Sequence, residues 1–408
     1  MREYPRAIIT DKGTRFLQEG HVWVYADEIT ALEGKPENGS IVDVYSKKGK
    51  YMGSGFYNSN SKIRVRIVSK NANDRFDEAF WERKLRWAIA YRKSVMGERD
   101  FSCCRLIFGE ADAFPGFTVD RFGNVVVSQV LSLGIELRKE MLYRILVRLL
   151  REEFGQEIVA LYERNDVAIR ELEGMEQYTA FWNGEGLRTD LDGKTEITEN
   201  SVIYGVDYIN GQKTGFFLDQ KYNRMAIRKI AQGKRVLDCF THTGSFALNA
   251  AQGGAAHVTA VDISADALAM AKKNAERNNL SDRMDFLCTD VFDLLTDIAR
   301  DGHRDYNFII LDPPAFTKSR DTLKNAIKGY KEINQKAMRL LPRGGYLATC
   351  SCSHFMTEPY FRKMLHDAAE DVGVGLRQIE ARQQSPDHPI LWNVPETDYL
   401  KFFIFQIV

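Results

Sequence analysis

The chain has 408 residues, more than one hydrophobic core usually organises, so two or three domains are expected. With 44% hydrophobic and 27% charged residues, its composition is that of a folded globular protein and excludes disordered and fibrous classes. The 56 basic residues balance the 56 acidic ones, so no global field attracts a polyanion. Any nucleic-acid site must therefore be a local basic patch.

Neither a signal peptide nor a membrane span is expected. The first residues, Met1 to Arg6, contain no apolar core, and polar residues interrupt the most apolar early stretch, 125–135. The six cysteines are too few and too unevenly spaced for a disulfide framework. We therefore expect the protein to work in a reducing cytoplasm, without a membrane partner.

The first domain, residues 1–72, is expected to be a small β-barrel with a basic patch. Short strands separated by Gly and Asn turns are predicted at 41–45, 51–57 and 62–67. The segment holds 12 Lys/Arg and 8 Asp/Glu, a net charge of +4. In the last strand Lys62, Arg64 and Arg66 alternate with apolar residues, and this pattern alone favours a charged edge strand over an RNA-contacting strand.

The second domain, residues 73–190, is expected to mix helices and strands. A helix is predicted from about Glu78 to Met96, and apolar residues recur at helical spacing between 137 and 150. A hairpin signal at Phe122-Gly123 joins two strand-like runs. Further strands are predicted near 158–162 and 177–182.

The third domain, residues 191–408, is expected to be an α/β domain with a Rossmann-like, doubly wound parallel sheet. From Arg235 onwards strands and helices alternate, and buried parallel strands with crossover helices account for that rhythm. A last strand at 401–407 is expected at the edge of the sheet. The predicted parallel strands are 236–240, 258–262, 284–288, 308–312 and 346–350.

Aspartates at four strand ends indicate a nucleoside-binding site, because ligands of such sheets bind beyond the carboxyl ends of the strands. The turn 238–244 lacks the glycines that let a backbone approach a pyrophosphate, which disfavours a nicotinamide cofactor. S-adenosylmethionine (SAM) has an adenosine, no phosphate and a cationic tail. We therefore expect Asp238 at its amino end, Asp262 at the ribose, Ile263 at the adenine face and Asp290 at the adenine amine.

Two features after the fourth and fifth strands belong to the same crevice. Asp312-Pro313-Pro314-Ala315-Phe316 is expected to form a rigid loop that presents Asp312 to a flat base, since proline fixes the backbone. Cys350 and Cys352 place two thiols at its mouth. Burial as small hydrophobic residues is expected for Cys239, Cys288 and one of this pair. No metal site is predicted, because no second Cys-x-Cys pair completes four ligands.

Further motifs join these along the chain, in the order Gly20–Val24, Ile107–Asp112, Phe114–Gly116, Gly211–Gln220, Asp238–Phe246, Leu311–Phe316 and Cys350–Ser353. In this order they resemble a known family. The chain is similar to class I SAM-dependent RNA methyltransferases, and most closely to the bacterial 23S ribosomal RNA large-subunit methyltransferase I family, which makes 5-methylcytosine and carries an N-terminal PUA domain. The resemblance runs nearly end to end. It departs at Cys350, because family members have one cysteine, at the position of Cys352.

The resemblance implies catalysis by Cys352 and Asp312, SAM as cofactor, and 23S rRNA or a ribosomal particle as partner. A cysteine is needed because a thiolate must add to cytosine C6 before C5 can accept a methyl group. Cys352 also lies nearer the carboxyl end of its strand than Cys350 does. A homodimer is left open. The predicted cofactor-binding residues are Gln220, Asp238, Phe240, Thr243, Gly244, Asp262, Ile263, Asp290, Val291 and Asp312.

Two alternatives remain at this stage. An Asp-Pro-Pro-x-Phe loop also resembles the loop with which amino-methylating enzymes hold an exocyclic nitrogen, a reaction that needs no thiol. Replacement of Cys352 discriminates between the two reactions. The other alternative is an RNA-binding protein whose methyltransferase fold has lost catalysis, for which failure to bind SAM would be the evidence. The base that removes the C5 proton is not identified.

Overall fold

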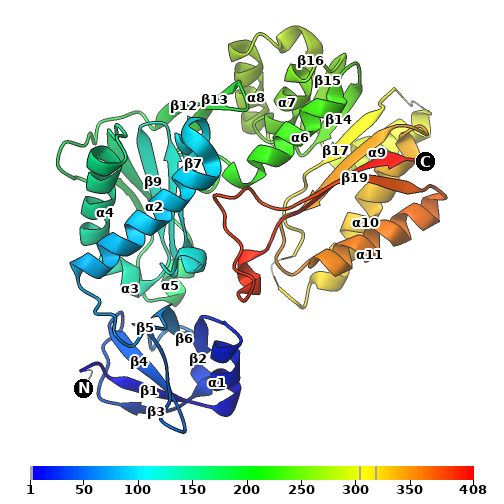
Figure 1. Cartoon of the computed structure of the whole chain (residues 1–408). Coiled ribbons are helices and arrows are strands. Elements are labelled where there is room, and N and C mark those ends of the chain that lie inside the picture. The colour runs from blue at the N-terminus through cyan, green and yellow to red at the C-terminus, as the bar shows by residue number, and fades with distance from the viewer. Residues whose placement is uncertain (1–2, 303–304, 318) are drawn as a thin grey trace. The chain divides into compact units, whose positions relative to one another are not determined.

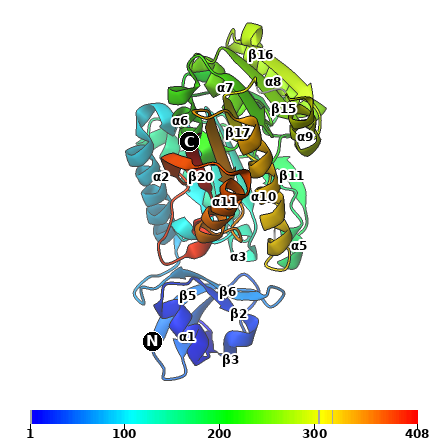
Figure 2. The same ribbon diagram turned by 90° about the vertical axis from the view of Figure 1, so that its right-hand side faces the viewer.

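The structure, a computed structural model, describes residues 3–302, 305–317 and 319–408 (Figures 1 and 2). The chain divides into two compact units. The first comprises Met1–Ile197, Val206–Leu218 and Pro386–Thr397; the second comprises Thr198–Gly205, Asp219–Ser385 and Asp398–Val408. Within the described ranges, no helix combines the length and the apolar character needed to cross a bilayer.

A six-stranded mixed sheet forms the N-terminal part of the first unit. Its strand order is β2-β6-β5-β4-β1-β3. Val24, Val42, Val44 and Val65 are fully buried and share one apolar core. The elements are β1 (Arg6–Ile9), α1 (Asp11–Gln18), β2 (Trp23–Tyr25), β3 (Ile29–Glu33), β4 (Ile41–Ser46), β5 (Tyr51–Tyr57) and β6 (Ile63–Ser69).

The prediction that the strand with alternating basic residues is an edge strand was wrong. β6 pairs with β2 on one side and β5 on the other. Arg66 is only 9% exposed, and its guanidinium lies 3.0 Å from Glu173 and 3.6 Å from Glu110. Alternation shows which side chains point away from the core of their own sheet, but not that carboxylates from a later segment cover that face.

The middle of the first unit is a five-stranded sheet in the order β11-β10-β9-β8-β7. The predicted hairpin at 122–123 is confirmed, with Gly123 at φ +65°, where glycine avoids strain. The predicted helix continues to Phe101 across a non-helical Gly97. The elements are α2 (Glu78–Phe101), β7 (Cys103–Phe108), β8 (Phe117–Phe122), β9 (Val125–Val130), α3 (Leu133–Glu136), α4 (Lys139–Arg148), β10 (Ala160–Asn165), α5 (Ile169–Leu172) and β11 (Tyr178–Phe181).

A seven-stranded sheet, ordered β16-β15-β14-β17-β18-β20-β19, forms the second unit. A separate two-stranded ribbon, β12 (Lys194–Glu199) and β13 (Val202–Asp207), precedes it in the chain. The elements that follow are α6 (Lys221–Ala231), β14 (Arg235–Cys239), α7 (Ser245–Gln252), β15 (His257–Asp262), α8 (Ala265–Arg277), β16 (Met284–Cys288), α9 (Val291–Asp301), β17 (Phe308–Leu311), α10 (Leu323–Leu340), β18 (Tyr346–Ser351), α11 (Glu358–Val372), β19 (Leu376–Arg382) and β20 (Lys401–Ile407).

The prediction of a doubly wound sheet is confirmed. β16, β15, β14, β17 and β18 are parallel, and the chain reverses its direction across the sheet between β14 and β17. Right-handed crossovers on either side of such a reversal place helices on both faces of the sheet. At this reversal the loops that follow β14 and β17 lead to opposite faces of the sheet. The carboxyl ends of these two strands are therefore the expected ligand site.

The prediction that 401–407 lies at the sheet edge was wrong. β20 runs antiparallel between β18 and β19, and β19 is the outermost strand. The run Lys401-Phe402-Phe403-Ile404-Phe405-Gln406-Ile407 is apolar on both faces, as a strand covered on both faces must be. Every residue of β19 is instead half-buried or exposed, as expected of an edge strand.

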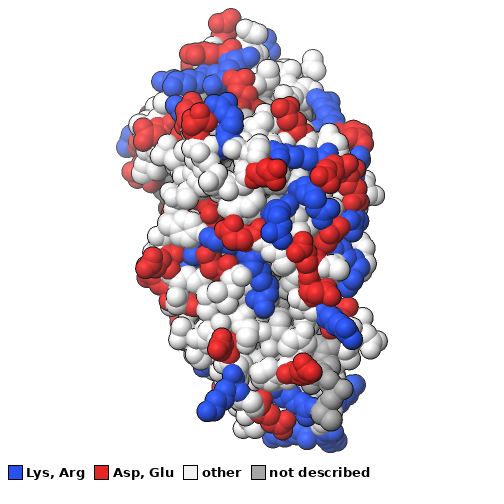
Figure 3. Space-filling model, turned by 90° about the vertical axis from the view of Figure 1, so that its left-hand side faces the viewer, with Lys and Arg blue, Asp and Glu red and all other residues white. Residues whose placement is uncertain are grey.

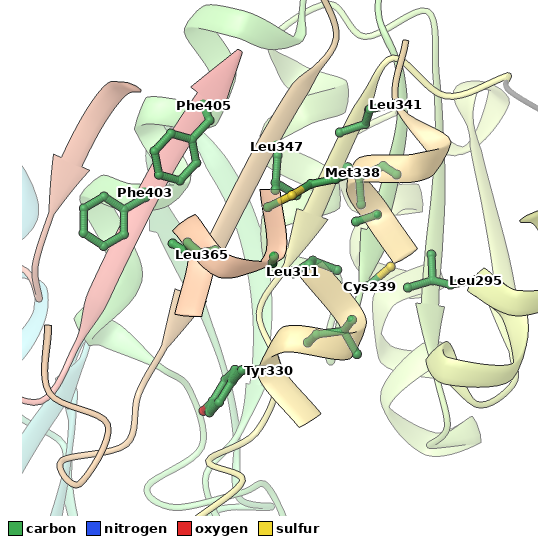
Figure 4. Close-up of a cluster of buried hydrophobic side chains, with 14 of the residues drawn as sticks. Cys239, Leu295, Leu311, Tyr330, Met338, Leu341, Leu347, Leu365, Phe403 and Phe405 are labelled. Atoms are coloured by element: carbon green, nitrogen blue, oxygen red, sulfur yellow. The ribbon is translucent and has the colours of Figure 1, made fainter. Parts of the chain in front are cut away.

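One large core fixes the sheet of the second unit against α9, α10 and α11. Leu311 and Leu347 from neighbouring strands, Leu365 from α11 and Phe403 from β20 belong to this cluster (Figure 4). Cys239 also lies there and is fully buried, as predicted. This packing fixes where the carboxyl ends of β14, β17 and β18 lie, and therefore the position of the loops that follow these strands.

Candidate active site

The carboxyl ends of β14 and β17 bring two aspartates to one place. Asp238 pairs with Ile310 in register, and Asp312 follows β17 by one residue, with its amide donating to the Cys239 carbonyl at 3.4 Å. Asp238 is fully buried, and Asp312 is half-buried. Burial is the main cause that raises the pKa of Asp238 to about 7 and that of Asp312 to about 6, and the charge of Asp312 adds to the shift of Asp238.

One oxygen of the Asp238 carboxyl has no partner. Oδ2 accepts from Thr241 Oγ1 at 2.5 Å and from the Ala247 amide at 2.9 Å, whereas the buried Oδ1 accepts no hydrogen bond. The hydroxyl of Thr243 is also buried without a partner. Unsatisfied buried polar atoms of this kind cost free energy, and a bound ligand with donor groups would satisfy them.

Asp262, the last residue of β15, anchors the turn between β14 and α7. Asp262 Oδ2 accepts from the His242 amide at 2.8 Å, and Oδ1 accepts from the Ser264 amide at 2.9 Å. The turn is tightly wound, with Phe240 at φ +63°, His242 at φ +51° and Gly244 at φ +83°. A Cβ on Gly244 would lie 3.0 Å from that of Ala271, so glycine lets α8 pack against the turn.

Three more predicted cofactor residues lie beyond β15 and β16. Ile263 is 71% exposed, unusual for an isoleucine at a strand end and available to the face of a ring. Asp290 caps α9 by accepting from the Phe292 amide at 2.7 Å and the Asp293 amide at 3.2 Å. Val291 packs in the core, so only its backbone is available to a ligand.

Asp312 forms a buried polar cluster with Gln220 and Cys350. Gln220 Nε2 donates to Asp312 Oδ1 at 3.2 Å, and the Cys350 thiol donates to the same oxygen at 2.9 Å. Asn223 in turn donates to Gln220 Oε1 at 2.6 Å, which fixes the amide orientation. Cys350 is 1% exposed, and burial followed by the charge of Asp312 raises the pKa of its thiol well above the ordinary value.

Cys352 lies just outside β18, in a loop that is held on both sides. Cys352 itself is half-buried. The hydroxyl of Ser351 donates to Tyr330 Oη at 3.0 Å, and the hydroxyl of Ser353 donates to the Thr317 carbonyl at 3.0 Å. The two thiols thus differ in environment: one is a buried hydrogen-bond donor to Asp312, and the other is partly accessible at the mouth of the crevice.

Comparisons with known proteins identify one family along nearly the whole chain. A PUA-like domain model matches residues 7–70, and an S-adenosylmethionine-dependent methyltransferase model matches 169–405. A "Ribosomal RNA large subunit methyltransferase I" of Klebsiella pneumoniae is 38% identical over 407 residues, covering 99% of both chains; one of Pseudoalteromonas translucida is 39% identical over 393 residues, covering 96% of both.

The chain belongs to the ribosomal RNA large subunit methyltransferase I family. It is a member of the SAM-dependent methyltransferases, so its cofactor is SAM. Solved structures share the fold. A chain described as a SAM-dependent methyltransferase from Streptococcus mutans has a TM-score of 0.81 at 22% identity, covering 98% of this chain and 99% of its own. A methyltransferase complexed with SAH has a TM-score of 0.82 at 21% identity, with the same coverage.

The family's cofactor fits the residues at the β14 and β15 ends. The unpartnered Asp238 Oδ1 is a carboxylate acceptor suited to the ammonium of the methionine tail, and Thr243 offers an unpartnered hydroxyl. Exposed Ile263 suits the adenine. Gln220, Phe240, Gly244 and Asp312 surround the same turn or the neighbouring strand end, whereas both Asp262 oxygens already accept backbone amides.

The sequence reasoning missed some partners and placed one cysteine wrongly. Thr241, which holds Asp238, and Cys350, which donates to Asp312, were not assigned these contacts; a hydroxyl three residues after a buried aspartate could have indicated the first. Cys288 was expected to be buried, yet it is exposed because β16 is an edge strand. Edge position depends on strand order, which a local window does not contain.

Proposed function

We propose that this enzyme methylates C5 of a cytosine in 23S ribosomal RNA with SAM as methyl donor, through a covalent bond between Cys352 and C6 of the base. The names of its relatives support ribosomal RNA of the large subunit as substrate. The observation that carries the chemistry is the half-buried Cys352, held by its neighbours beside the Asp312-Pro313-Pro314 loop.

The covalent step follows from the electronic structure of the base. Cytosine C5 is a weak nucleophile within the aromatic ring, so the Cys352 thiolate adds to C6 and the C5–C6 electron pair becomes available at C5. SAM, when bound, supplies the methyl group. After C5 has acquired it, a base removes the C5 proton, the electron pair re-forms the C5–C6 double bond, and the C6–S bond breaks to release Cys352.

Asp312 is proposed to hold the polar edge of the target base. Two side chains fix its carboxyl, Gln220 and Cys350, and both donate to Oδ1. As a carboxylate it would accept from the exocyclic amine of cytosine; as a carboxylic acid it would donate to N3. Because burial raises the pKa of Asp312 to about 6, both forms are accessible near neutral pH.

Cys352 is favoured over Cys350 as the nucleophile. The Cys350 thiol is buried against Asp312, whose negative charge opposes a second negative charge beside it. Cys352 is half-buried, so it is more accessible than Cys350. Cys350 is the buried cysteine expected of this pair, and its thiol is in addition a partner of Asp312.

The test uses RNA with 5-fluorocytosine at the target position, because fluorine at C5 cannot leave as a proton and the covalent complex persists on a denaturing gel. We expect an adduct with the wild type and with Cys350→Ala, but none with Cys352→Ala, which should still bind SAM. Cys288→Ala, which removes an exposed thiol at the end of β16, is the control. An adduct in Cys352→Ala but not in Cys350→Ala would reverse the assignment.

A wild type that methylates RNA without forming an adduct would instead favour the exocyclic-amine reaction, whose loop motif this chain also carries. Retained methylation by Cys352→Ala would lead to the same conclusion. Failure of the wild type to bind SAM in calorimetry would favour a non-catalytic RNA-binding role. Mass mapping of ribosomal RNA from a deletion strain would identify the nucleotide.

A further inference from the structure

A buried lysine beside the proposed nucleophile has no role in the mechanism above. Lys401 is the first residue of β20 and is only 4% exposed. It pairs in register with Ser351, the last residue of β18. A lysine side chain is almost never buried this fully unless its charge is paired.

The ammonium of Lys401 connects the loop after Cys352 to the start of β20. Its Nζ donates to the Ser353 carbonyl at 2.6 Å and to the Tyr399 carbonyl at 2.7 Å. Ser353 follows Cys352 directly, so the first bond fixes the backbone on the carboxyl side of the thiol. With Ser351 held by Tyr330, the cysteine is anchored on both sides.

The charge of Lys401 has no direct counter-ion. No carboxylate lies within 4.0 Å of its nitrogen in the described ranges, and both acceptors are neutral carbonyls. The ionisable groups that act on it are Asp398 from the preceding loop, Cys352 and Cys350 from the end of β18, and Glu358 from α11. Burial lowers the pKa of Lys401 to about 8, and negative charge on each of these groups favours the ammonium.

Both carboxylates in this set also have other partners. Glu358 is 2.6 Å from Arg362 on the exposed side of α11. The charge of Asp398 acts on Lys401 more strongly than the others do, and Asp398 also accepts from Gln383 at 3.2 Å. Cys352, in contrast, lies in the segment that Lys401 itself holds. Electrostatic coupling is reciprocal, so an anion that stabilises the ammonium is stabilised by it to the same extent.

We propose that Lys401 is a positioning residue for Cys352, whose ammonium fixes the loop through the Ser353 carbonyl and stabilises the Cys352 thiolate. The thiol proton goes to solvent and Lys401 keeps its own, so the lysine is neither acid nor base. The inference rests on the proposed role of Cys352 as nucleophile. It adds a positioning residue from the last strand, far in sequence from the proposed catalytic residues.

The experiment measures alkylation of Cys352 by iodoacetamide between pH 6 and 9, without RNA or SAM, with peptide mass spectrometry to resolve each cysteine. In Lys401→Met we expect the midpoint of the rate–pH curve to move to higher pH and the alkylation rate at pH 7 to fall about threefold to tenfold. The smaller fraction of thiolate at pH 7 should outweigh the greater intrinsic reactivity of each thiolate. Lys401→Arg, which keeps the charge, should retain the wild-type midpoint. Exposed Cys288 provides the reference in each sample.

Lys363→Met is the matched control, since it removes an exposed lysine that pairs with Asp367 in the same unit. Identical Cys352 profiles in wild type and in folded Lys401→Met would overturn the proposal, because a purely structural lysine alters stability but not the thiol midpoint. If Lys401→Met fails to fold, the wild type decides: a Cys352 midpoint at or above about 8.5, the ordinary thiol value, overturns it. The 5-fluorocytosine adduct tests the nucleophile separately.

Discussion

At the scale of single residues, the site is defined by carboxyl groups taken out of water. Asp238 and Asp312 are held protonated more readily than in an unfolded chain, since burial raises the pKa of both. A carboxyl whose pKa is raised in the folded state stabilises the fold at pH values below its pKa in the unfolded state. That contribution is lost as the pH rises through its pKa in the folded state. For Asp238 the loss extends from about pH 4 to about pH 7. A cationic ligand would compensate it.

SAM binding should therefore depend on pH through Asp238. In the proposed site Asp238 must be ionised to pair with the ammonium of the ligand, so each unit of pH below about pH 7 should lower the affinity by up to about tenfold. Asp238→Asn should bind more weakly at pH 8 and lose most of this dependence. Isothermal calorimetry from pH 5.5 to 8 measures both effects.

Asp282→Asn, an exposed aspartate in the same unit, is the control and should keep the wild-type profile. Calorimetry in buffers with different ionisation enthalpies adds a direct check, because wild type near pH 6 should release close to one proton on binding. A wild-type affinity that is constant across the range would remove Asp238 from the amino end of the cofactor.

At the scale of elements, the antiparallel strand β20 matters more than its late position in the chain suggests. It covers β18, whose end carries Cys352, and it contributes Lys401 to that loop and Phe403 to the core. Phe403 stacks against Phe361 of α11 at 6.0 Å between ring centroids. β20 therefore links the core packing to the geometry of the proposed nucleophile.

Truncating Phe403 should destabilise the second unit strongly. We expect Phe403→Ala to lower the free energy of unfolding by about 3–5 kcal/mol, since it leaves a cavity among aromatic neighbours. Ile379→Ala, at an exposed position of β19, should change the free energy of unfolding by no more than about 0.5 kcal/mol. Denaturant unfolding measures the two values, and similar costs for both variants would contradict the packing role of β20.

The sequence predicts some of these elements well and others poorly, for physical reasons. β14 to β18 have long apolar runs and clear turns, so their type and order along the chain were predictable. No strand was predicted for β12, β13 or β19; β12 and β19 contain no long apolar run. Strand neighbours depend on contacts distant in sequence, so the misplacement of β6, β20 and Cys288 has one cause.

The candidate site shows the same division. Aspartates at successive strand ends could be predicted because parallel strands align their carboxyl ends at one edge. Side-chain partners could not, since Cys350 meets Asp312 and Lys401 meets Ser353 only after β17, β18 and β20 are adjacent. A lysine at the start of an apolar strand reads as solvent-exposed until that adjacency is known.

At the scale of the whole molecule, charge is balanced and interspersed. Figure 3 shows basic and acidic side chains mixed over one face, without a large area of either sign. In the first unit, Arg66 and Arg92 form ion pairs with carboxylates, so their guanidinium groups have a structural role and are not available to RNA. The positive excess of residues 1–72 must act through other side chains, such as those of the turn between β4 and β5.

Lys47, Lys48 and Lys50 in that turn are all exposed and form no ion pair within the described ranges, so they are free to neutralise phosphates. Replacing all three with Gln should weaken RNA binding and reduce the slope of log K against log salt by about 2 to 3, because each phosphate contact contributes about 0.7 to 0.9. SAM affinity should not change. Filter binding at several salt concentrations measures the slope.

Removing charges here is preferable to deleting residues 1–72, because Phe56 of β5 stacks on Trp81 of α2 at 5.8 Å and deletion would expose that contact. The matched control replaces three exposed cations of the second unit, Arg339, Arg343 and Lys363, with Gln. If the two triple variants lose the same affinity and slope, the effect is one of net charge, and residues 1–72 have no special share in binding RNA. A slope reduced only by the β4–β5 variant would locate phosphate contacts on that turn, since both variants carry the same net charge.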